Sequence, residues 1–413
     1  MRSVWIGLAG LALSTAVHAK TIAVEIFDSP YDAIQEALLL AEPGDVIELP
    51  AGTFALQDGL SLDIADITLR GQGRDATVLN FKGQETGAEG LIITADNAVI
   101  EYLAVEDTKG DAIKAKGVDG ITFRGLRVEW TDGPLETNGA YGLYPVEARN
   151  VLIEDCVAIG ASDAGIYVGQ SQDIIVRNSR AEYNVAGIEI ENSYRADVYN
   201  NVATNNTGGI LVFDLPNLPQ QGGHQVRVFN NKSVNNNTDN FAPEGNIVGQ
   251  VPRGTGVMII ANRDVEIFEN EIGDHDTVNV LIASYPKDYD DDEYDPRPKR
   301  VHVHHNEFGP AGEKPDGDFG EMLSKVLKTP IPDIVWDGVV TVTERLFGIE
   351  ENNRMSIHDN GDATFANADA MLSLTVGLTF GVDRDLANYA EPLPSLPEVT
   401  IKQEGADTAA VSE

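Results

Sequence analysis

The chain has 413 residues, and aspartate and glutamate outnumber lysine and arginine by 66 to 29, which gives a formal net charge of −37 at pH 7. An acidic balance of this size excludes nucleic acids and anionic membranes as expected partners, because both bind basic surfaces. The single cysteine excludes a disulfide bond within the chain.

The first 19 residues have the features of a secretory signal peptide. Arg2 is followed by an apolar run from Val4 to Val17 and then by the small residue Ala19. The run is shorter than the roughly 18 residues that suggest a membrane-spanning helix. We therefore expect cleavage after Ala19, a periplasmic or secreted mature protein, and no membrane span.

Residues 31–41 form the next predicted element, an amphipathic helix with Ile34 and Leu38 on its apolar face. Pro43 and Gly44 end it, and a strand is predicted to follow at 46–49. We expect the helix to cap the exposed strand edge at the start of the structure that follows.

Residues 98–308 repeat a short segment of alternating apolar residues, seen best at 226–231, 265–270 and 301–306. Period-two alternation predicts strands rather than helices. The residues that close the copies form one column: Leu103, Leu126, Cys156, Ser179, Asn201, Asn231, Asn270 and Asn306. Their spacing has a base period of 22–23 residues with insertions. Three short strands in such a period make one coil of a right-handed parallel β-helix, with coils about 4.8 Å apart.

The column predicts a buried ladder of polar side chains. We expect inward asparagines such as Asn231 and Asn270 to hydrogen-bond from coil to coil. Cys156 lies in the same column, so we expect a buried small residue rather than a reactive thiol.

The start of the chain also resembles a known family. Residues 34–54 (IQEALLLAEPGDVIELPAGTF) and 67–79 (ITLRGQGRDATVL) resemble the N-terminal cap and first coil of the pectate-lyase-like superfamily. The whole chain resembles uncharacterised exported bacterial proteins described as parallel β-helix repeat proteins. The resemblance implies an all-β, right-handed parallel β-helix. It implies no single activity, because the superfamily contains lyases, hydrolases, epimerases and non-enzymes.

A second strand in each coil has a glycine near its start, as at 164–169 and 186–191. The glycine indicates either a positive φ or a close approach of neighbouring coils. Alternation predicts two outward rows on these strands: Lys114, Tyr144, Tyr167, Glu189, Leu211 and Met258, with Lys116, Gly169, Glu191 and Phe213 beside them. Four insertions flank these strands and predict a loop-walled groove: 131–140, 215–223, 237–253 and 286–299.

Aromatic and acidic residues of the outward rows are candidates for ligand binding. Tyr144 and Tyr167 would suit sugar rings, or would form a stabilising aromatic ladder. Glu189 and Glu191, with Asp214 one coil further on, could divide acid and base roles or hold a cation. A solvated acidic face is the alternative.

Lys114 and Lys116 are unusual cations in so acidic a chain. Uronate lyases and epimerases abstract a proton with a Lys, Arg, His or Tyr while a cation neutralises the sugar carboxylate, although two surface lysines are the simpler interpretation. His224 could meet Asp214 across the 215–223 loop as a general base, or could be a turn residue. The resulting assignment is catalytic for Lys114, Glu189, Glu191 and His224, and substrate-binding for Lys116, Tyr144, Tyr167 and Asp214.

Metal ligands are suggested at two places, and no metal is assigned. His302 and His304 alternate on one strand like two ligands of a metal site, with no third ligand evident. The run 288–295 is dense in oxygen ligands that suit calcium, but it lacks the glycine and spacing of a helix-loop-helix calcium loop. A solvated acidic loop is the favoured interpretation there.

The repeat is lost beyond Phe308. We expect a capped β-helix over 20–308, a C-terminal cap and side cover over 309–391, and a flexible tail over 392–413. A helix at 321–328 and a strand at 371–382 are predicted within the cap. Something must also cover the apolar outward residues Leu211, Phe213 and Met258.

The preferred hypothesis is an exported β-helix protein that binds a polysaccharide in the loop-walled groove, with cleavage or epimerisation of a polyuronate as its candidate reaction. The alternative is a non-catalytic periplasmic or envelope protein that binds a protein partner or a metal. No nucleophile elbow, phosphate loop or dinucleotide fingerprint is found in the sequence.

Overall fold

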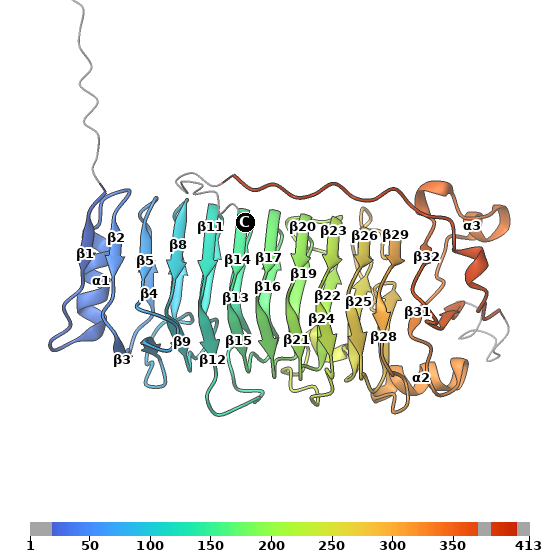
Figure 1. Ribbon diagram of the computed structural model, residues 1–413, viewed down its shortest axis with the longest axis horizontal. Coiled ribbons are helices and arrows are strands. Elements are labelled where there is room, and N and C mark those ends of the chain that lie inside the picture. The colour runs from blue at the N-terminus through green and yellow to red at the C-terminus, as the bar shows by residue number, and fades with distance from the viewer. Residues whose placement is uncertain (1–18, 371–380, 403–413) are drawn as a thin grey trace, which may run out of the picture.

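The computed structural model describes residues 19–370 and 381–402, and it shows an elongated parallel β-helix (Figure 1). Every ladder between its named strands is parallel, and successive coils stack along one axis. The all-β solenoid predicted from the repeat is therefore confirmed. Across the described residues, no helix is both long enough and apolar enough to span a membrane.

Three sheets form the walls. The 12-stranded sheet contains, in spatial order, β1 (Thr21–Ala23), β2 (Val46–Glu48), β5 (Thr68–Arg70), β8 (Ala98–Glu101), β11 (Asp119–Arg124), β14 (Arg149–Glu154), β17 (Gln172–Arg177), β20 (Tyr194–Tyr199), β23 (His224–Phe229), β26 (Arg263–Phe268), β29 (Lys299–His304) and β32 (Ser356–His358). The 11-stranded sheet contains β33 (Phe365–Asn367), β31 (Ile334–Trp336), β28 (Val278–Ala283), β25 (Thr255–Ile260), β22 (Gly208–Phe213), β19 (Ala186–Glu191), β16 (Ala164–Gly169), β13 (Tyr141–Val146), β10 (Ile113–Lys116), β7 (Leu91–Ile93) and β4 (Leu60–Leu62). The 10-stranded sheet contains β3 (Gly52–Ala55), β6 (Thr77–Asn80), β9 (Ala104–Glu106), β12 (Arg127–Glu129), β15 (Val157–Ile159), β18 (Arg180–Glu182), β21 (Val202–Thr204), β24 (Lys232–Val234), β27 (Glu271–Gly273) and β30 (Glu307–Phe308).

Helices lie at the two ends of the solenoid and on its sides. The α-helices are α1 (Pro30–Leu40), α2 (Gly317–Leu327) and α3 (Val342–Phe347), and the short 3₁₀ helices are η1 (Val248–Gln250), η2 (Glu351–Asn353) and η3 (Leu386–Asn388). Helix α1 begins after Ser29, whose side chain accepts a hydrogen bond from the Asp32 amide. Its residues Ile34 and Leu38 are buried in the core at the first coils, as the predicted cap requires.

The predicted polar ladder is present. Asn231 receives the amide N–H of Asn201 on its Oδ1 at 2.9 Å, and its own Nδ2 donates to Asn270 Oδ1 at 3.0 Å. The ladder runs from Cys156 to Asn306 and continues to Asn360, one coil beyond the predicted column. Cys156 is buried, and burial raises the pKa of its thiol to about 12, which fits the expected structural role.

The glycines of the 11-stranded sheet permit close approach of coils rather than a positive φ. A Cβ on Gly187 would lie 2.6 Å from the Gly209 carbonyl oxygen, and one on Gly209 would lie 2.5 Å from the Gly256 carbonyl oxygen. Of the two explanations drawn from the sequence, close approach is correct for these positions.

The solenoid does not end at Phe308, contrary to the prediction. Strands β31 and β33 extend the 11-stranded sheet by two strands, and β32 extends the 12-stranded sheet by one. Long insertions separate these strands, so the 22-residue period is hidden in the sequence. Helix α2 covers 317–327, close to the predicted 321–328, whereas most of the strand predicted at 371–382 lies outside the described residues.

The first residues of the expected flexible tail are packed on the protein. Residues 392–402 run back along the 12-stranded sheet, from β32 towards β14 (Figure 1). The backbone amides of Leu396, Val399 and Lys402 donate to the side chains of Glu266, Asp197 and Asn150 at 2.8, 3.1 and 3.0 Å. These three bonds explain why the segment follows the sheet without adding a strand to it.

Candidate functional site

Much of the outward face of the 11-stranded sheet is covered, so the predicted groove is not open along its length. The outward residues Leu211, Phe213 and Met258 are buried in a second apolar core. The cover comes from two of the insertions and from the C-terminal region, and its members include Val248, Val251, Tyr294, Leu323 and Leu327. The apolar half of the row is therefore a packing surface, as the need for a cover suggested.

Three tyrosines meet where the cover ends. The ring centroid of Tyr141 lies 4.4 Å from that of Tyr144 and 4.5 Å from that of Tyr167. Tyr141 and Tyr144 are partly exposed, whereas Tyr167 is only 3% exposed. The expectation that Tyr167 faces solvent is wrong, because neighbouring side chains enclose it.

Two glutamates predicted to face solvent are also buried. Glu189 is 1% exposed, and its Oε2 has no hydrogen-bond partner among the described residues. Glu191 is 7% exposed and accepts a 2.7 Å hydrogen bond from the Tyr167 hydroxyl. Gly169 makes room for that bond, because a Cβ there would lie 2.3 Å from the Tyr167 hydroxyl oxygen.

Burial shifts the ionisation of this group of acids, which also contains Asp163. Desolvation raises the pKa of Glu189 well above its usual range, and the neighbouring carboxyls Asp163 and Glu191 add to the effect. Desolvation likewise raises the pKa of Asp163 and that of Glu191 to about 7. We call Tyr141, Tyr144, Tyr167, Asp163, Glu189 and Glu191 the tyrosine–carboxylate cluster.

Lys114 lies at the open end of this cluster. Its Nζ is 3.3 Å from both Glu89 Oε1 and Asp111 Oδ2, and 4.7 Å from the ring centroid of Tyr144. Its side chain is 20% exposed and Tyr144 is partly exposed, so both residues reach the surface. Lys116 is more exposed and lies 3.7 Å from Glu147. The predicted neighbourhood of Lys114 and Tyr144 is thus observed.

His224 and Asp214 do not form the predicted acid–base pair. The carboxylate of Asp214 accepts the backbone N–H groups of Gly222 and Gly223 at 3.2 and 2.8 Å, which fixes the 215–223 loop. Desolvation raises the pKa of Asp214 to about 6, and these two bonds oppose the shift. The His224 ring packs against Tyr194 with an interplanar angle of 33°, and its Nδ1 lies 2.7 Å from the Gly222 carbonyl oxygen. Both residues therefore shape a loop rather than face a shared substrate.

The acidic run 288–295 is likewise used in loop packing. Asp291 accepts hydrogen bonds from the Asn217 amide and from Gln221 Nε2, and Asp295 pairs with Arg297 and Lys299. The candidate metal ligands gathered in the described part of the chain are instead Glu266, His302 and His304, on the 12-stranded sheet.

The sequence did not single out Tyr141 or Asp163 as site residues. Tyr141 begins strand β13 and Asp163 directly precedes β16, so both lie in corners before the glycine of their coil. The sequence feature that could have identified Tyr141 and Asp163 is their position next to the outward rows. The contact of Asp163 with Asn246, 83 residues away, depends on a loop whose path the sequence does not give.

Comparisons with known proteins agree with the architecture. Residues 66–217 match the family model described as "Right handed beta helix region". The fold is similar to that of the Azotobacter vinelandii mannuronan C-5 epimerase AlgE4 A-module, at 18% identity and a TM-score of 0.50, covering 69% of this chain and 86% of that one.

Some of the other similar structures have lower TM-scores. They include an alginate lyase from Paenibacillus sp., at 17% identity and a TM-score of 0.49, covering 72% of this chain and 98% of that one. A family 28 exopolygalacturonase from Yersinia enterocolitica is 13% identical with a TM-score of 0.41, covering 71% of this chain and 66% of that one. No curated protein matches the sequence. The chain therefore has the fold of a right-handed parallel β-helix, and its residues 66–217 match the right-handed β-helix family model.

Proposed function

We propose that this is an exported protein that binds an acidic polysaccharide, a polyuronate, at the open end of the tyrosine–carboxylate cluster. The observation that carries the proposal is the placement of Lys114 Nζ 4.7 Å from the centre of the Tyr144 ring, with both residues reaching the surface. A uronate unit has a carboxylate that an ammonium group neutralises and an apolar ring face that packs on tyrosine. Lys116, on the same strand, supplies a second cation.

The raised pKa values of the buried acids support binding of a polyanion. A carboxyl group whose pKa is raised towards or above neutrality is largely uncharged at neutral pH. Glu189, and in part Asp163 and Glu191, therefore add less negative charge to this face than their number suggests. This lowers the negative charge that a uronate meets at this face, where Lys114 is already paired with Glu89 and Asp111.

The fold gives further support, at a coarser level. The similar structure with the highest TM-score reported above is described as a mannuronan C-5 epimerase, a protein that acts on a polyuronate. Export is proposed from the signal-like sequence of residues 1–19, and it would bring the protein to where such polymers occur.

Proton transfer on the bound sugar is a second candidate function. It is favoured by the pKa of about 7 of Asp163 and of Glu191, because a general acid or base is most effective when its pKa is near the working pH. Tyr144 would then act as a hydrogen-bond donor rather than as a base, since burial raises the pKa of its hydroxyl.

The test is a set of binding titrations with purified protein. Polymannuronate, polyguluronate and polygalacturonate are compared with neutral glucans of similar length, at low and high salt. The proposal predicts binding of at least one polyuronate that weakens with salt, and weaker binding to Lys114→Met. The control is Lys232→Met, since Lys232 also pairs with a glutamate but lies on the 10-stranded sheet. Equal affinity for neutral glucans, or no effect of Lys114→Met, would contradict it.

The same incubations test catalysis. New ultraviolet absorbance from unsaturated sugar ends reports cleavage by a lyase, and proton NMR of the polymer reports epimerisation. Binding without either signal would leave the protein as a polysaccharide-binding module and remove the second candidate function.

A further inference from the structure

We propose that Glu266, His302 and His304 form a binding site for a transition-metal cation of the Zn²⁺ type. The site lies on the 12-stranded sheet, whereas the tyrosine–carboxylate cluster lies on the 11-stranded sheet. It is independent of the proposed polysaccharide binding.

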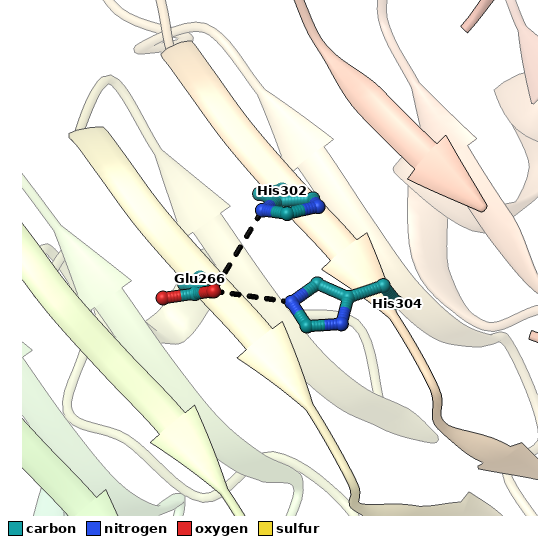
Figure 2. A group of neighbouring side chains, drawn as sticks. All are labelled: Glu266, His302 and His304. Atoms are coloured by element: carbon teal, nitrogen blue, oxygen red, sulfur yellow. Dashed lines mark hydrogen bonds and ion pairs between the residues drawn. The ribbon is translucent and has the colours of Figure 1, made fainter. Parts of the chain in front are cut away.

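Register brings the three side chains together. Glu266 on β26 is the direct partner of His302 on β29, and His304 lies two residues further along β29 on the same face. Figure 2 shows both imidazole rings next to the Glu266 carboxylate. Two histidines and a glutamate are a ligand set found in zinc sites. The glutamate is the third ligand that the sequence did not reveal, because 36 residues separate it from its strand partner.

The spacing of the ligand atoms suits one small cation. Glu266 Oε1 lies 3.1 Å from His304 Nε2 and 3.7 Å from His302 Nδ1. Ligand atoms at about 2.0–2.2 Å from a tetrahedral zinc ion are roughly 3.3–3.5 Å apart, so the two observed distances bracket the expected value. The side chains of Glu266 and His302 are 3% and 5% exposed and that of His304 is 12%, so His304 is the member of the group most open to solvent.

The hydrogen-bond network leaves the lone pair of His302 Nδ1 facing the carboxylate. His358 Nδ1 lies 2.8 Å from Asp359 Oδ2, and an ionised carboxylate only accepts, so this nitrogen carries the proton. If the His358 ring carries only this proton, its Nε2 accepts from His302 Nε2, which lies 2.8 Å away. His302 must then donate through Nε2, and its Nδ1 is left unprotonated.

That nitrogen has no hydrogen-bond partner among the described residues. Its nearest acidic atom is Glu266 Oε1, so a lone pair faces a negatively charged oxygen in a buried place. Such an arrangement is unfavourable unless a cation lies between the two atoms. A metal ion there would accept both groups as ligands.

Outer contacts hold the ligands in this orientation. The other nitrogen of His304, Nδ1, lies 2.8 Å from His305 Nδ1, and the second oxygen of Glu266 accepts the Leu396 amide at 2.8 Å. Metal-binding histidines usually donate their second N–H to such a partner, which fixes the tautomer. The docked tail segment thus belongs to the outer shell of the site.

Aromatic stacking accounts for His304 but not for the rest. The rings of Phe229, Phe268, His304 and His358 stack with interplanar angles of 4–7° and centroid distances of 4.9–5.3 Å. Stacking would be served equally well by phenylalanine. It gives no reason for Glu266 beside the stack or for the unpaired nitrogen of His302.

The test uses the full chain, stripped with a chelator and titrated with Zn²⁺ by calorimetry. We expect one zinc ion per chain, and at least a tenfold weaker affinity in Glu266→Gln and in His302→Gln, because each loses a direct ligand. The control is Glu154→Gln, since Glu154 is a similarly placed outward carboxylate of the same sheet that contacts Arg124 and Arg177 instead of histidines. Circular dichroism checks that each variant is folded. If Glu266→Gln does not fold, the zinc affinity of His302→Gln tests the proposal alone.

Cobalt gives a second, spectroscopic readout. Co²⁺ in the wild-type site should show the visible bands of a four- or five-coordinate ion with nitrogen ligands, and these should be absent in both ligand variants. No zinc binding by the wild type would overturn the proposal. It would mean that a proton, rather than a metal ion, lies between His302 Nδ1 and Glu266 Oε1. Binding with unchanged affinity in both ligand variants would also overturn it and would place the zinc elsewhere, for example on the acidic run 288–295.

Discussion

The hydroxyl of Tyr167 donates a hydrogen bond of 2.7 Å to Glu191 from the neighbouring coil, and both side chains are buried. The two residues were expected to face solvent and contact a ligand separately. Instead they form one unit within the wall of the 11-stranded sheet, and Gly169 provides the space for it. The partly exposed neighbours Lys114 and Tyr144 are the residues of this group that reach the surface.

Tyr167→Phe should therefore destabilise the fold. The change removes the donor and leaves a buried carboxyl oxygen unpaired, at a cost of about 1–3 kcal/mol in the free energy of unfolding. Chemical denaturation followed by circular dichroism measures it. Tyr183→Phe is the control, because Tyr183 is 43% exposed. Equal midpoints for the two variants would show that the hydrogen bond contributes nothing.

Glu191→Gln should change how stability depends on pH. Desolvation raises the pKa of Glu191 from 4.5 to about 7, so the folded state holds this proton more tightly than the unfolded state does. The contribution of the Glu191 carboxyl to folding stability is complete below about pH 4.5 and is lost as the pH rises through about 7. As the pH rises from 4.5 to 8, the free energy of unfolding of Glu191→Gln should thus increase by roughly 1–3 kcal/mol relative to that of the wild type.

Denaturation midpoints measured across this range give the difference directly. If the plots of denaturation midpoint against pH are parallel for wild type and Glu191→Gln, the Glu191 carboxyl is not the titrating group. Glu129→Gln serves as the control, because Glu129 is a partly exposed glutamate of the 10-stranded sheet.

Replacement of Asn270 by Leu should break the polar ladder. Asn270 Oδ1 accepts from the amides of Asn231, and its Nδ2 donates to Val228 O and Asn306 Oδ1 at 2.9 Å each. Leucine leaves these buried groups unpaired, which should cost at least about 1–3 kcal/mol. Gln57→Leu, at an exposed position, should change stability by less than about 0.5 kcal/mol. Similar unfolding midpoints for both variants would argue against a stabilising ladder.

Two adjacent leucines test the role of helix α1. Leu38 is 1% exposed in the core, whereas Leu39 is 62% exposed. Leu38→Asp should displace the helix and uncover the strand edges at the end of the solenoid, which promotes association between chains. Light scattering should then show oligomers for Leu38→Asp and monomers for Leu39→Asp. Monomers in both cases would mean that the helix does not protect the edge.

The column of asparagines could be predicted because its signal is local. Each copy, such as 226–231 or 265–270, carries its own alternation and its own closing residue, and register follows once the period is known. The additional strands were missed because long insertions interrupt the period between β30 and β32.

The candidate sites were harder to predict, because their environment comes from segments distant in sequence. Alternation gave the outward direction of Tyr167 and Glu189 correctly, but not the cover that buries them, which comes from insertions with no repeat of their own. The tail was expected to be free because residues 392–402 have no strand pattern. Its contacts with Glu266 and Asp197 use backbone amides, which any sequence can supply.

The most direct test of the proposed polyuronate site is the affinity of Tyr144→Ala, measured by calorimetry with the polyuronate that binds the wild type best. The proposal predicts at least about tenfold weaker binding, because loss of an aromatic contact in a binding site typically costs more than 1 kcal/mol. Tyr183→Ala, which removes an exposed tyrosine elsewhere, should bind like the wild type. Unchanged affinity in Tyr144→Ala, or equal losses in the two variants, would contradict the placement of the site beside Lys114.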